Sequence, residues 1–369
     1  MEITWGAVVA RRMRRHGLTE AFGTAVEAVR GMCGAHAQIA AAGEVSVAVR
    51  VEGADRGSVQ RDDGLVKTFG PRGTVHLLPL EDLPMWTGAL SALPGNGQQP
   101  EPIRMSPDEI DQVVVAIGEA LADADLTVDE LTEEVVRRTG EWARTPTIPA
   151  FQGAWRWRQA VHVAAHAGVL CHGPVRGRLT TYSNPHRLRP FDPMPQDKAL
   201  TELLHRYLYS YGPATPQQFA RWLSVPPTTV KPYFDDLPRA TLADHTVWYA
   251  PGDGDFPDER AEGVRLLPYF DAYGVGSYPR ELLFPGKAFE RATARGQAGN
   301  YPLLLVDGIV AGVWHQKKAG RTLHVTVEAL TPLNRRRRTL LDAEVDRLGA
   351  ILGGTPSLTL GDVTVGAHA

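Results

Sequence analysis

The sequence of 369 residues contains little cysteine and no long apolar run. Only Cys33 and Cys171 are present, without a Cys-x-x-Cys pair, so neither a disulfide framework nor a zinc site is indicated. No segment is long and apolar enough to cross a bilayer. The apolar run from Trp5 to Ala10 is too short for a signal peptide, and arginines follow it directly. We therefore expect a cytoplasmic protein.

The chain also has little net charge, −3 at neutral pH, which argues against an indiscriminate nucleic-acid coat. Its basic residues are nevertheless clustered, at Arg11 to Arg15, at Lys317 to Arg321 and at Arg335 to Arg338, while acidic residues gather elsewhere. This segregation permits one positive face on a slightly acidic protein. At about 150 residues per domain, the length predicts two to four domains.

Residues 1–95 have the pattern of a winged helix. Apolar and basic residues alternate at helical spacing over residues 3–16, and one or two short helices are expected over residues 22–41. Residues 65–78 read as strand, turn and strand, with Pro71 and Gly73 supplying the turn.

The same order recurs over residues 96–192. Ser106 predicts the N-cap of a helix over residues 106–123, and Thr127 with Glu130 predicts a capping box. A helix over residues 155–168 and a second strand, turn and strand follow, with the turn at Gly173 to Gly177.

A third such unit is predicted over residues 193–255. It has a helix over residues 198–211, a helix over residues 216–223 capped by Thr215, a candidate recognition helix starting near Pro227 or Thr228, and a closing strand over residues 246–250. Residues 251–262 read as a linker or long loop. Residues 256–369 are β-rich, with an Asp307-Gly308 hairpin turn and one helix near residues 335–350.

Three segments resemble one known family. They are KTFGPRGTVHLLPLEDLP (67–84), LLPYFDAY (266–273) and LLVDGIVAGVW (304–314). Together they are similar to the bacterial winged-helix proteins typified by AlkZ and YcaQ, the interstrand-crosslink DNA glycosylases. The resemblance implies an α+β fold of three tandem winged-helix modules in a C shape, with a small C-terminal β-barrel.

The resemblance also implies an activity. The expected reaction is hydrolysis of the N-glycosidic bond of N7-alkylguanine, in bulky adducts or interstrand crosslinks, by a monofunctional enzyme. The expected partner is double-stranded DNA containing alkylated purines. No metal or organic cofactor is expected, and the protein is expected to be a monomer. In a high-GC bacterium, which the Ala-, Arg- and Gly-rich composition suggests, such an enzyme would give self-resistance to a DNA-alkylating metabolite.

The candidate catalytic residues are His36 and Gln38 in the stretch CGAHAQIA. Members of the family carry Gln-x-Gln or Gln-x-Asp at these positions, so the first glutamine is replaced by histidine here. Alkylation at N7 makes guanine cationic, and the base leaves as a neutral species. The enzyme must then mainly align a water and tolerate positive charge on the sugar. Imidazole and amide groups accept hydrogen bonds from water, and neutral His36 is the form we expect to act.

Further basic residues are candidates for DNA contact. Those on the first helix, the two wings, the Trp-Arg repeat and the C-terminal hairpin are Arg12, Arg15, Lys67, Arg72, His76, Arg156, Arg158, Arg176, Arg178, Lys317, Lys318 and Arg321. Structural alternatives remain open for several of them: Arg72 pairing with a carboxylate such as Glu81, and His76 in the core. Asp271 and Tyr273 are expected to support packing and orientation.

A second function of a different class stays open at this point. The replaced glutamine would also fit a non-catalytic winged-helix DNA-binding protein, such as a transcription regulator. Regulators usually bind a palindrome as dimers, and the sequence shows no coiled coil or obvious dimerisation helix.

Overall fold

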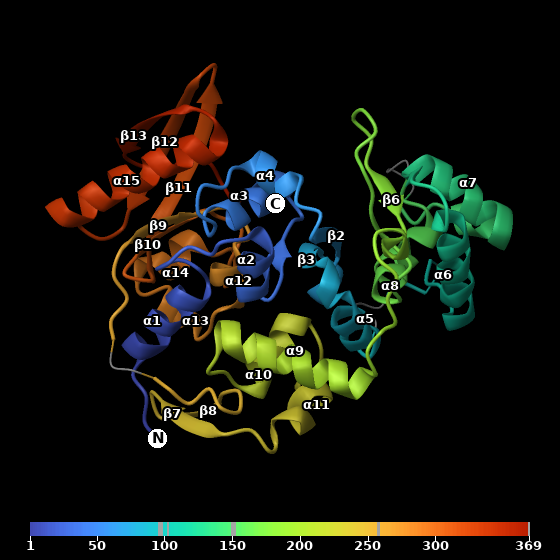
Figure 1. The fold of residues 1–369 in the computed structure, drawn as a ribbon, viewed down its shortest axis with the longest axis horizontal. Coiled ribbons are helices and arrows are strands. Elements are labelled where there is room, and N and C mark those ends of the chain that lie inside the picture. The colour runs from blue at the N-terminus through green and yellow to red at the C-terminus, as the bar shows by residue number, and fades with distance from the viewer. Residues whose placement is uncertain (95–98, 102, 149–152, 257–258, 368–369) are drawn as a thin grey trace. The chain divides into compact units, whose positions relative to one another are not determined.

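The computed structural model describes residues 1–94, 99–101, 103–148, 153–256 and 259–367 (Figure 1). The chain divides into two compact units. Unit 1 comprises Met1–Asp63, Leu204–Phe219 and Val230–Ala369, and unit 2 comprises Gly64–Leu203 and Ala220–Thr229. Within the described residues, no helix combines the length and the apolar character that a membrane span needs.

The N-terminal part of unit 1 is helical, as predicted. Helix α1 (Trp5–Arg15) starts at Thr4, whose hydroxyl accepts a hydrogen bond from Ala7 N at 3.2 Å. Helix α2 (Ala25–Gly31) starts with a capping box of Thr24 and Glu27. A short strand, β1 (Ala35–His36), precedes α3 (Ala40–Ala48), so residues 22–41 hold a strand that was not predicted. Helix α4 (Arg56–Gln60) follows.

The C-terminal part of unit 1 contains a five-stranded sheet in the order β13-β12-β11-β10-β9. Its strands are β9 (Val264–Leu267), β10 (Leu303–Val306), β11 (Ile309–Ala319), β12 (Thr322–Ala329) and β13 (Thr355–Leu360). Asp307 and Gly308 turn β10 into β11 with φ of 51° and 78°, as the Asp-Gly pair predicted. Among the described strands, β9 and β13 remain edges, so the predicted small barrel is wrong and the sheet is open.

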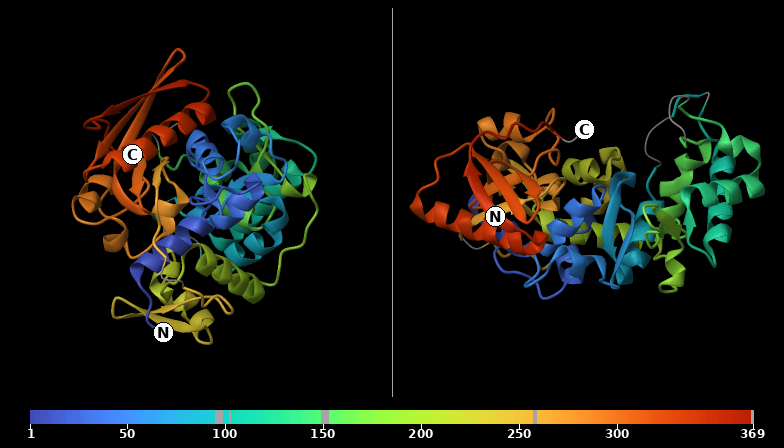
Figure 2. Two further views of the ribbon diagram at one scale, coloured as in Figure 1. Left: turned by 60° about the vertical axis from the view of Figure 1, so that its left-hand side comes forward. Right: turned by 90° about the horizontal axis from the view of Figure 1, so that it is seen from above.

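A crossover helix explains why the sheet does not continue as antiparallel hairpins. Helix α15 (Arg335–Leu352), predicted near residues 335–350, connects β12 to β13, which are parallel. Parallel neighbours require such a crossover, and α15 contacts both β9 and β13 (Figure 2). Helices α12 (Ala272–Gly276), α13 (Arg280–Leu283) and α14 (Lys287–Ala292) lie between β9 and β10 in the chain.

The predicted third module is only partly regular. Helices α9 (Gln196–Tyr211), α10 (Pro216–Leu223) and α11 (Pro227–Val230) each run across a boundary between the units. Thr215 accepts from Gln218 N at 3.3 Å and so caps α10 as expected. The candidate recognition helix is a single turn, α11. Strands β7 (Arg239–Leu242) and β8 (His245–Trp248) form an antiparallel hairpin.

Unit 2 contains the two predicted hairpins. Strands β2 (Leu65–Phe69) and β3 (Val75–Pro79) are antiparallel and joined through Pro71–Gly73. Strands β5 (Cys171–His172) and β6 (Thr181–Ser183) pair in a sheet of order β4-β6-β5, with β4 at Leu126–Thr127. The helices are α5 (Leu83–Ser91), α6 (Pro107–Leu121), α7 (Val128–Thr139) and α8 (Val161–His166).

The helix starts and the core of unit 2 follow the sequence closely. Capping boxes at Ser106 with Glu109 and at Thr127 with Glu130 open α6 and α7, as predicted. Residues 155–168 are less regular than expected, because Arg156–Ala160 form a 3-10 helix before α8. The apolar faces of α6, α7 and α8 enclose Trp157, which is fully buried and donates to Thr132 Oγ1 at 3.2 Å.

His76 belongs to this interior and not to a DNA-facing surface. Its ring is 2% exposed, and Nδ1 lies 2.8 Å from the carbonyl oxygen of Thr74. Burial, with a smaller effect of Arg72, lowers the pKa of His76 to about 3. The ring is therefore neutral in the folded protein, and the core alternative holds in place of the predicted phosphate contact.

This burial predicts a pH dependence of stability. In the unfolded chain His76 takes up a proton below about pH 6.5, whereas the folded chain resists protonation down to about pH 3. Stability is therefore lost as the pH falls from 7 to 5, by about 2 kcal/mol for this residue. Urea unfolding at both pH values should show that His76→Phe loses about 2 kcal/mol less than wild type over this range.

The exposed His245 on β8 provides the control, since His245→Gln should leave the pH dependence unchanged. An identical pH dependence in wild type and His76→Phe would contradict the assignment of a buried neutral imidazole.

Candidate active site

His36 and Gln38 lie on a tight connection between α2 and α3. After α2, Cys33 and Gly34 adopt φ of 52° and 92°, which reverses the chain into β1. Gly34 tolerates this conformation, whereas a side chain such as that of Cys33 is strained by about 1–2 kcal/mol. His36 is 8% exposed, and Gln38, two residues later, is exposed. The imidazole is thus held by the protein while the amide faces outward.

Gly43 in α3 packs closely against the connection between α2 and α3 that carries His36. A Cβ atom at Gly43 would lie 2.7 Å from the carbonyl oxygen of His36 and 3.0 Å from Cα of Ala37. Real Cβ atoms do not approach backbone atoms this closely, so only glycine allows α3 to pack directly against the motif. The backbone of the two candidate residues is therefore fixed by the helix that follows them.

An aromatic side chain from the C-terminal part of unit 1 contacts the motif. The ring of Phe270 lies 6.3 Å from the His36 ring, centroid to centroid, at an interplanar angle of 35°. This distance is within the range of favourable aromatic pairs. Phe270 is half-buried and follows β9 in the LLPYFDAY segment. The sequence drew attention to this segment through Asp271 and Tyr273, but not to its phenylalanine.

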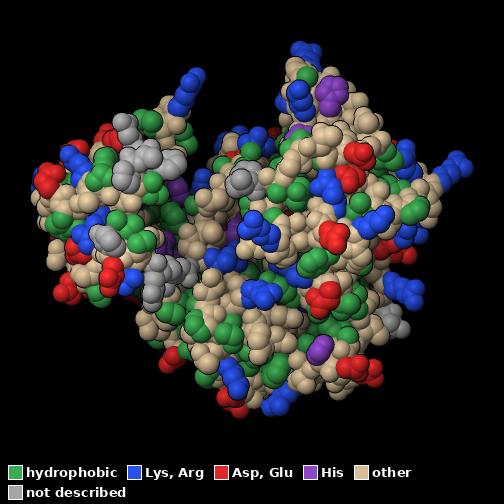
Figure 3. Space-filling model, turned by 180° about the vertical axis from the view of Figure 1, so that it is seen from behind, with side chains coloured by type: hydrophobic (Ala, Val, Ile, Leu, Met, Phe, Trp, Pro, Cys, Tyr) green, Lys and Arg blue, Asp and Glu red, His purple; other side chains and the backbone are tan. Residues whose placement is uncertain are grey.

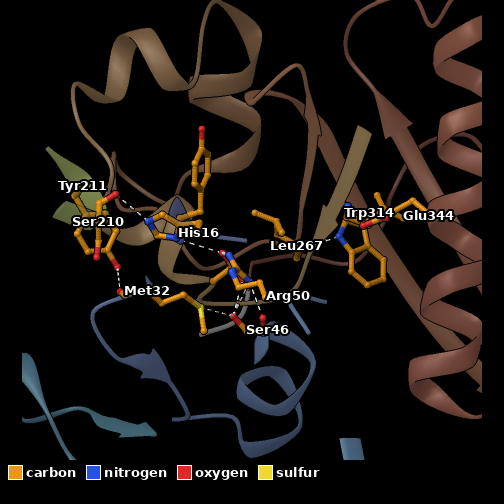
Figure 4. Close-up of polar contacts among 12 residues, drawn as sticks. His16, Met32, Ser46, Arg50, Ser210, Tyr211, Leu267, Trp314 and Glu344 are labelled. Atoms are coloured by element: carbon orange, nitrogen blue, oxygen red, sulfur yellow. Dashed lines mark hydrogen bonds and ion pairs between the residues drawn. The ribbon is translucent and has the colours of Figure 1, made fainter. Parts of the chain in front are cut away.

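Beneath the motif lies a buried polar cluster, which we call the frame and define as Ser46, Arg50, Tyr211 and Asp271. Arg50 donates to both carboxylate oxygens of Asp271 at 2.8 and 2.7 Å, and neither side chain is exposed. Ser46 donates to the same carboxylate at 2.6 Å. Figure 4 shows Ser46 and Arg50 next to each other on one side of Met32, while the Tyr211 hydroxyl reaches Met32 from another part of unit 1.

The frame reaches the motif at Met32, the C-cap of α2. Tyr211 donates its hydroxyl to Met32 O at 2.6 Å, and Ser46 Oγ lies 3.6 Å from Met32 Sδ (Figure 4). Asp271 also accepts from Tyr273 N at 3.0 Å and so starts α12, which supports its predicted role in packing and orientation. The frame therefore holds both the segment before His36 and the segment that carries Phe270.

His16 borders the frame, and no sequence pattern had singled it out. It is fully buried, and Nε2 lies 3.1 Å from Ser210 O. Its ring packs edge-on against Tyr211 and Tyr273. Burial, reinforced by the positive charge of Arg50, lowers the pKa of His16 well below its usual value. His16 is therefore a neutral packing residue near neutral pH.

Two of the predicted DNA contacts on α1 have structural roles instead. Arg12 is 1% exposed, and it donates to the carbonyl oxygens of Gly212, Pro213 and Tyr278 at 2.7–3.4 Å. Burial lowers the pKa of Arg12 to about 10, so the guanidinium remains charged but has no surface for a phosphate. Arg15 is paired with Asp253 through contacts of 2.8 and 2.5 Å.

In unit 2, two further candidates contact the protein itself. Arg72 sits in the β2–β3 turn with φ of 64° and donates to Trp222 O at 2.8 Å. Glu81, its expected alternative partner, lies 3.5 Å from Arg189. Arg156 contacts Glu109 at 2.9 Å and Arg104 O at 2.6 Å. Lys67 is half-buried on β2, close enough for its charge to contribute to the lowered pKa of His172.

The remaining cations are exposed. Lys317, Lys318 and Arg321 lie at the tip of the β11–β12 hairpin of unit 1, where Figure 3 shows Lys and Arg side chains gathered on a projection. Lys318 Nζ also contacts the carbonyl oxygens of Leu352 and Gly353. Arg158, Arg176 and Arg178 are exposed in unit 2. Of these, Arg176 pairs with Glu130 at 2.8 Å, a solvent-exposed contact worth little.

The described residues offer no cluster of three or more His, Cys, Asp or Glu side chains that could hold a metal ion. Both cysteines are buried and unpaired with each other. The chemistry available around His36 is therefore that of imidazole, amide and aromatic groups over a buried ion pair.

Comparison with known proteins places the chain in a family. The family described as "DNA glycosylase AlkZ-like" matches residues 29–351. An "Interstrand DNA cross-link repair glycosylase" from Streptomyces sahachiroi is 32% identical over 334 residues, which cover 85% of this chain and 88% of the relative. The solved structure of Streptomyces sahachiroi DNA glycosylase AlkZ matches with a TM-score of 0.84 at 26% identity, covering 98% of this chain and 100% of that one. The predicted resemblance is thus confirmed: the chain has the mixed α+β fold of AlkZ and belongs to the AlkZ-like DNA glycosylase family.

Proposed function

We propose that this protein is a monofunctional DNA glycosylase that hydrolyses the N-glycosidic bond of N7-alkylguanine by means of a water aligned by His36 and Gln38. The observation that carries the proposal is the geometry of the motif. His36 is fixed by the backbone packing of Gly43 and by Phe270, while Gln38 is exposed two residues away. Membership of the AlkZ-like DNA glycosylase family supports the same reading.

The proposed reaction needs little acid catalysis. The N7-alkylated base carries a positive charge, and cleavage of the bond to C1′ returns the bonding electron pair to the base, which leaves neutral. Positive charge then develops on the deoxyribose, and water adds to C1′ and gives up its extra proton to the surrounding solvent. Gln38 accepts a hydrogen bond from this water through its amide oxygen, and neutral His36 accepts another through a ring nitrogen. Alignment of one water is the main contribution of the enzyme.

DNA would be held by exposed cations. We propose that phosphates are contacted by Arg158, Arg176 and Arg178 in unit 2 and by Lys317, Lys318 and Arg321 in unit 1. We also propose that the chain comprises three winged-helix modules, at residues 1–95, 96–192 and 193–255, followed by the C-terminal domain. Arg12, His76 and the paired Arg15 are left out of this set, because their side chains are buried or already engaged.

The name of one relative supports a proposal for the substrate class. The curated relative from Streptomyces sahachiroi is named as an interstrand DNA cross-link repair glycosylase. We therefore propose bulky N7 adducts and interstrand crosslinks as substrates, and self-resistance to a DNA-alkylating metabolite as the biological role.

Loss of the Gln38 amide should slow base release. Single-turnover assays on a duplex with one N7-methylguanine should show alkali-labile sites with wild type, and a rate about 10²-fold lower for Gln38→Ala, because the water loses its alignment. Gln112→Ala, which changes an exposed glutamine on α6, serves as the matched control and should cleave like wild type. Equal rates for Gln38→Ala and wild type would contradict a role of Gln38 in aligning the water, and a wild-type rate no higher than spontaneous depurination would favour a DNA-binding protein without catalysis.

The protonation state of His36 should affect the rate of base release. A protonated ring cannot accept from water and repels the developing sugar cation, so activity should decrease as His36 takes up a proton. The ratio of the wild-type rate to that of His36→Gln should fall as the pH is lowered, because a ring that takes up a proton loses its acceptor nitrogen and glutamine does not titrate. A ratio that rises below about pH 6, after spontaneous depurination is subtracted, would contradict a neutral imidazole.

A side chain at Gly43 should disturb the His36 motif. Alanine normally stabilises a helix interior relative to glycine by about 1 kcal/mol. At this position the added Cβ must push the backbone of His36 and Ala37 away, so Gly43→Ala should slow base release by about 10²-fold.

Gly57→Ala in α4 is the control for Gly43→Ala, because its Cβ would meet mainly the mobile end of the Arg61 side chain. Base release by Gly57→Ala should match wild type. If Gly43→Ala also retained full activity, the motif would not need its observed position.

A further inference from the structure

Phe270 adopts a backbone conformation that bulky residues avoid. Its φ is 54°, in the left-handed region that glycine and asparagine enter readily and phenylalanine does not. A strained residue persists only where its surroundings impose the conformation, and such residues concentrate at functional sites. The strain at Phe270 therefore calls for an account of what the ring does in this place.

The surroundings that impose the strain are identifiable. Phe270 N donates to Gly299 O at 2.8 Å, and Gly299 packs so closely that a Cβ there would lie 2.8 Å from Phe270 Cδ1. On the other side, Asp271 is fixed by two contacts from Arg50 at 2.8 and 2.7 Å. The residue is thus clamped from both sides, with its ring beside His36.

The ring has a chemical feature that suits the substrate of the proposed function. The face of an aromatic ring is electronegative and attracts cations by about 0.5–2 kcal/mol. N7-alkylguanine is cationic before cleavage, and the deoxyribose becomes cationic during it. Phe270 is half-buried, so the residue keeps some exposure to solvent, and its ring lies beside the imidazole.

We propose that Phe270 is a specificity-determining residue that contacts the cationic alkylated nucleoside through its aromatic face. This inference rests on the proposed function, since it assigns a substrate contact to the same site. The strained backbone at Phe270 would direct the ring to that contact, and the frame would keep it there.

Activity measurements on a duplex with one N7-methylguanine test the aromatic contact. Phe270→Tyr, which keeps the aromatic face, should release base within about twofold of wild type. Phe270→Leu, which keeps an apolar side chain without the face, and Phe270→Gly should each be slower by about tenfold or more. Wild-type rates for Phe270→Leu would overturn the proposal.

Thermal unfolding separates this role from simple packing. Glycine relieves the left-handed strain as it removes the ring, so Phe270→Gly should melt close to wild type while its activity is lost. Phe289→Leu, at an exposed phenylalanine of α14 in the same unit, is the control and should leave base release unchanged. If Phe270→Gly and Phe270→Leu lost activity only in proportion to the fraction unfolded at the assay temperature, the proposal would fail.

Binding measurements distinguish failure of this inference from failure of the proposed function. In a Gln38→Ala background, which slows hydrolysis enough for binding to be measured, the affinity ratio of the N7-methylguanine duplex to the unmodified duplex should exceed one. Adding Phe270→Gly should bring the ratio to about one, whereas adding Phe289→Leu should not change it. An inactive wild type would refute the proposed function alone, while a lesion preference that survives Phe270→Gly would refute only the role of Phe270.

Discussion

The ion pair between Arg50 and Asp271 is the interaction on which the candidate site depends. It joins residues 221 positions apart in the sequence, and neither side chain reaches solvent. Because both charges are desolvated, removing one partner of such a pair costs about 3–5 kcal/mol. Its carboxylate also binds Ser46 and starts α12. One buried contact thus connects the helix that supports the His36 motif to the segment that presents Phe270.

The two segments that meet at His36 each contain a residue in a strained backbone conformation, which lowers the local stability of the fold. Cys33, three residues before His36, and Phe270, beside its ring, both adopt left-handed backbone conformations. Elsewhere in unit 1 such conformations occur in turns, as at Asp307 and Gly308 between β10 and β11, where an Asp-Gly pair tolerates them. A frame of buried hydrogen bonds compensates for this strain, which explains why so many polar groups lie beneath a motif of only two candidate catalytic side chains.

Local features of the fold could be predicted from the sequence, and features made by distant contacts could not. The capping boxes at Ser106 and Thr127 and the Asp307-Gly308 turn depend on neighbouring residues, so their patterns were sufficient. The motif at His36 was found through the resemblance of other segments to a family. Arg12 was misassigned to DNA contact because its partners lie 200 to 266 residues away. No sequence pattern revealed the strain at Phe270, and the parallel pairing of β13 with β12 left the sheet open where a barrel had been expected.

We propose that the imidazole of His36 and the amide of Gln38, held on the frame, release the alkylated base by aligning one water. Mass spectrometry of the small molecules released from an N7-methylguanine duplex tests this role of the two side chains. We expect wild type to release free 7-methylguanine in amounts equal to the abasic sites formed, and the double variant His36→Ala, Gln38→Ala, with unchanged circular dichroism, to release none above the spontaneous background. Equal release by wild type and the double variant would contradict it.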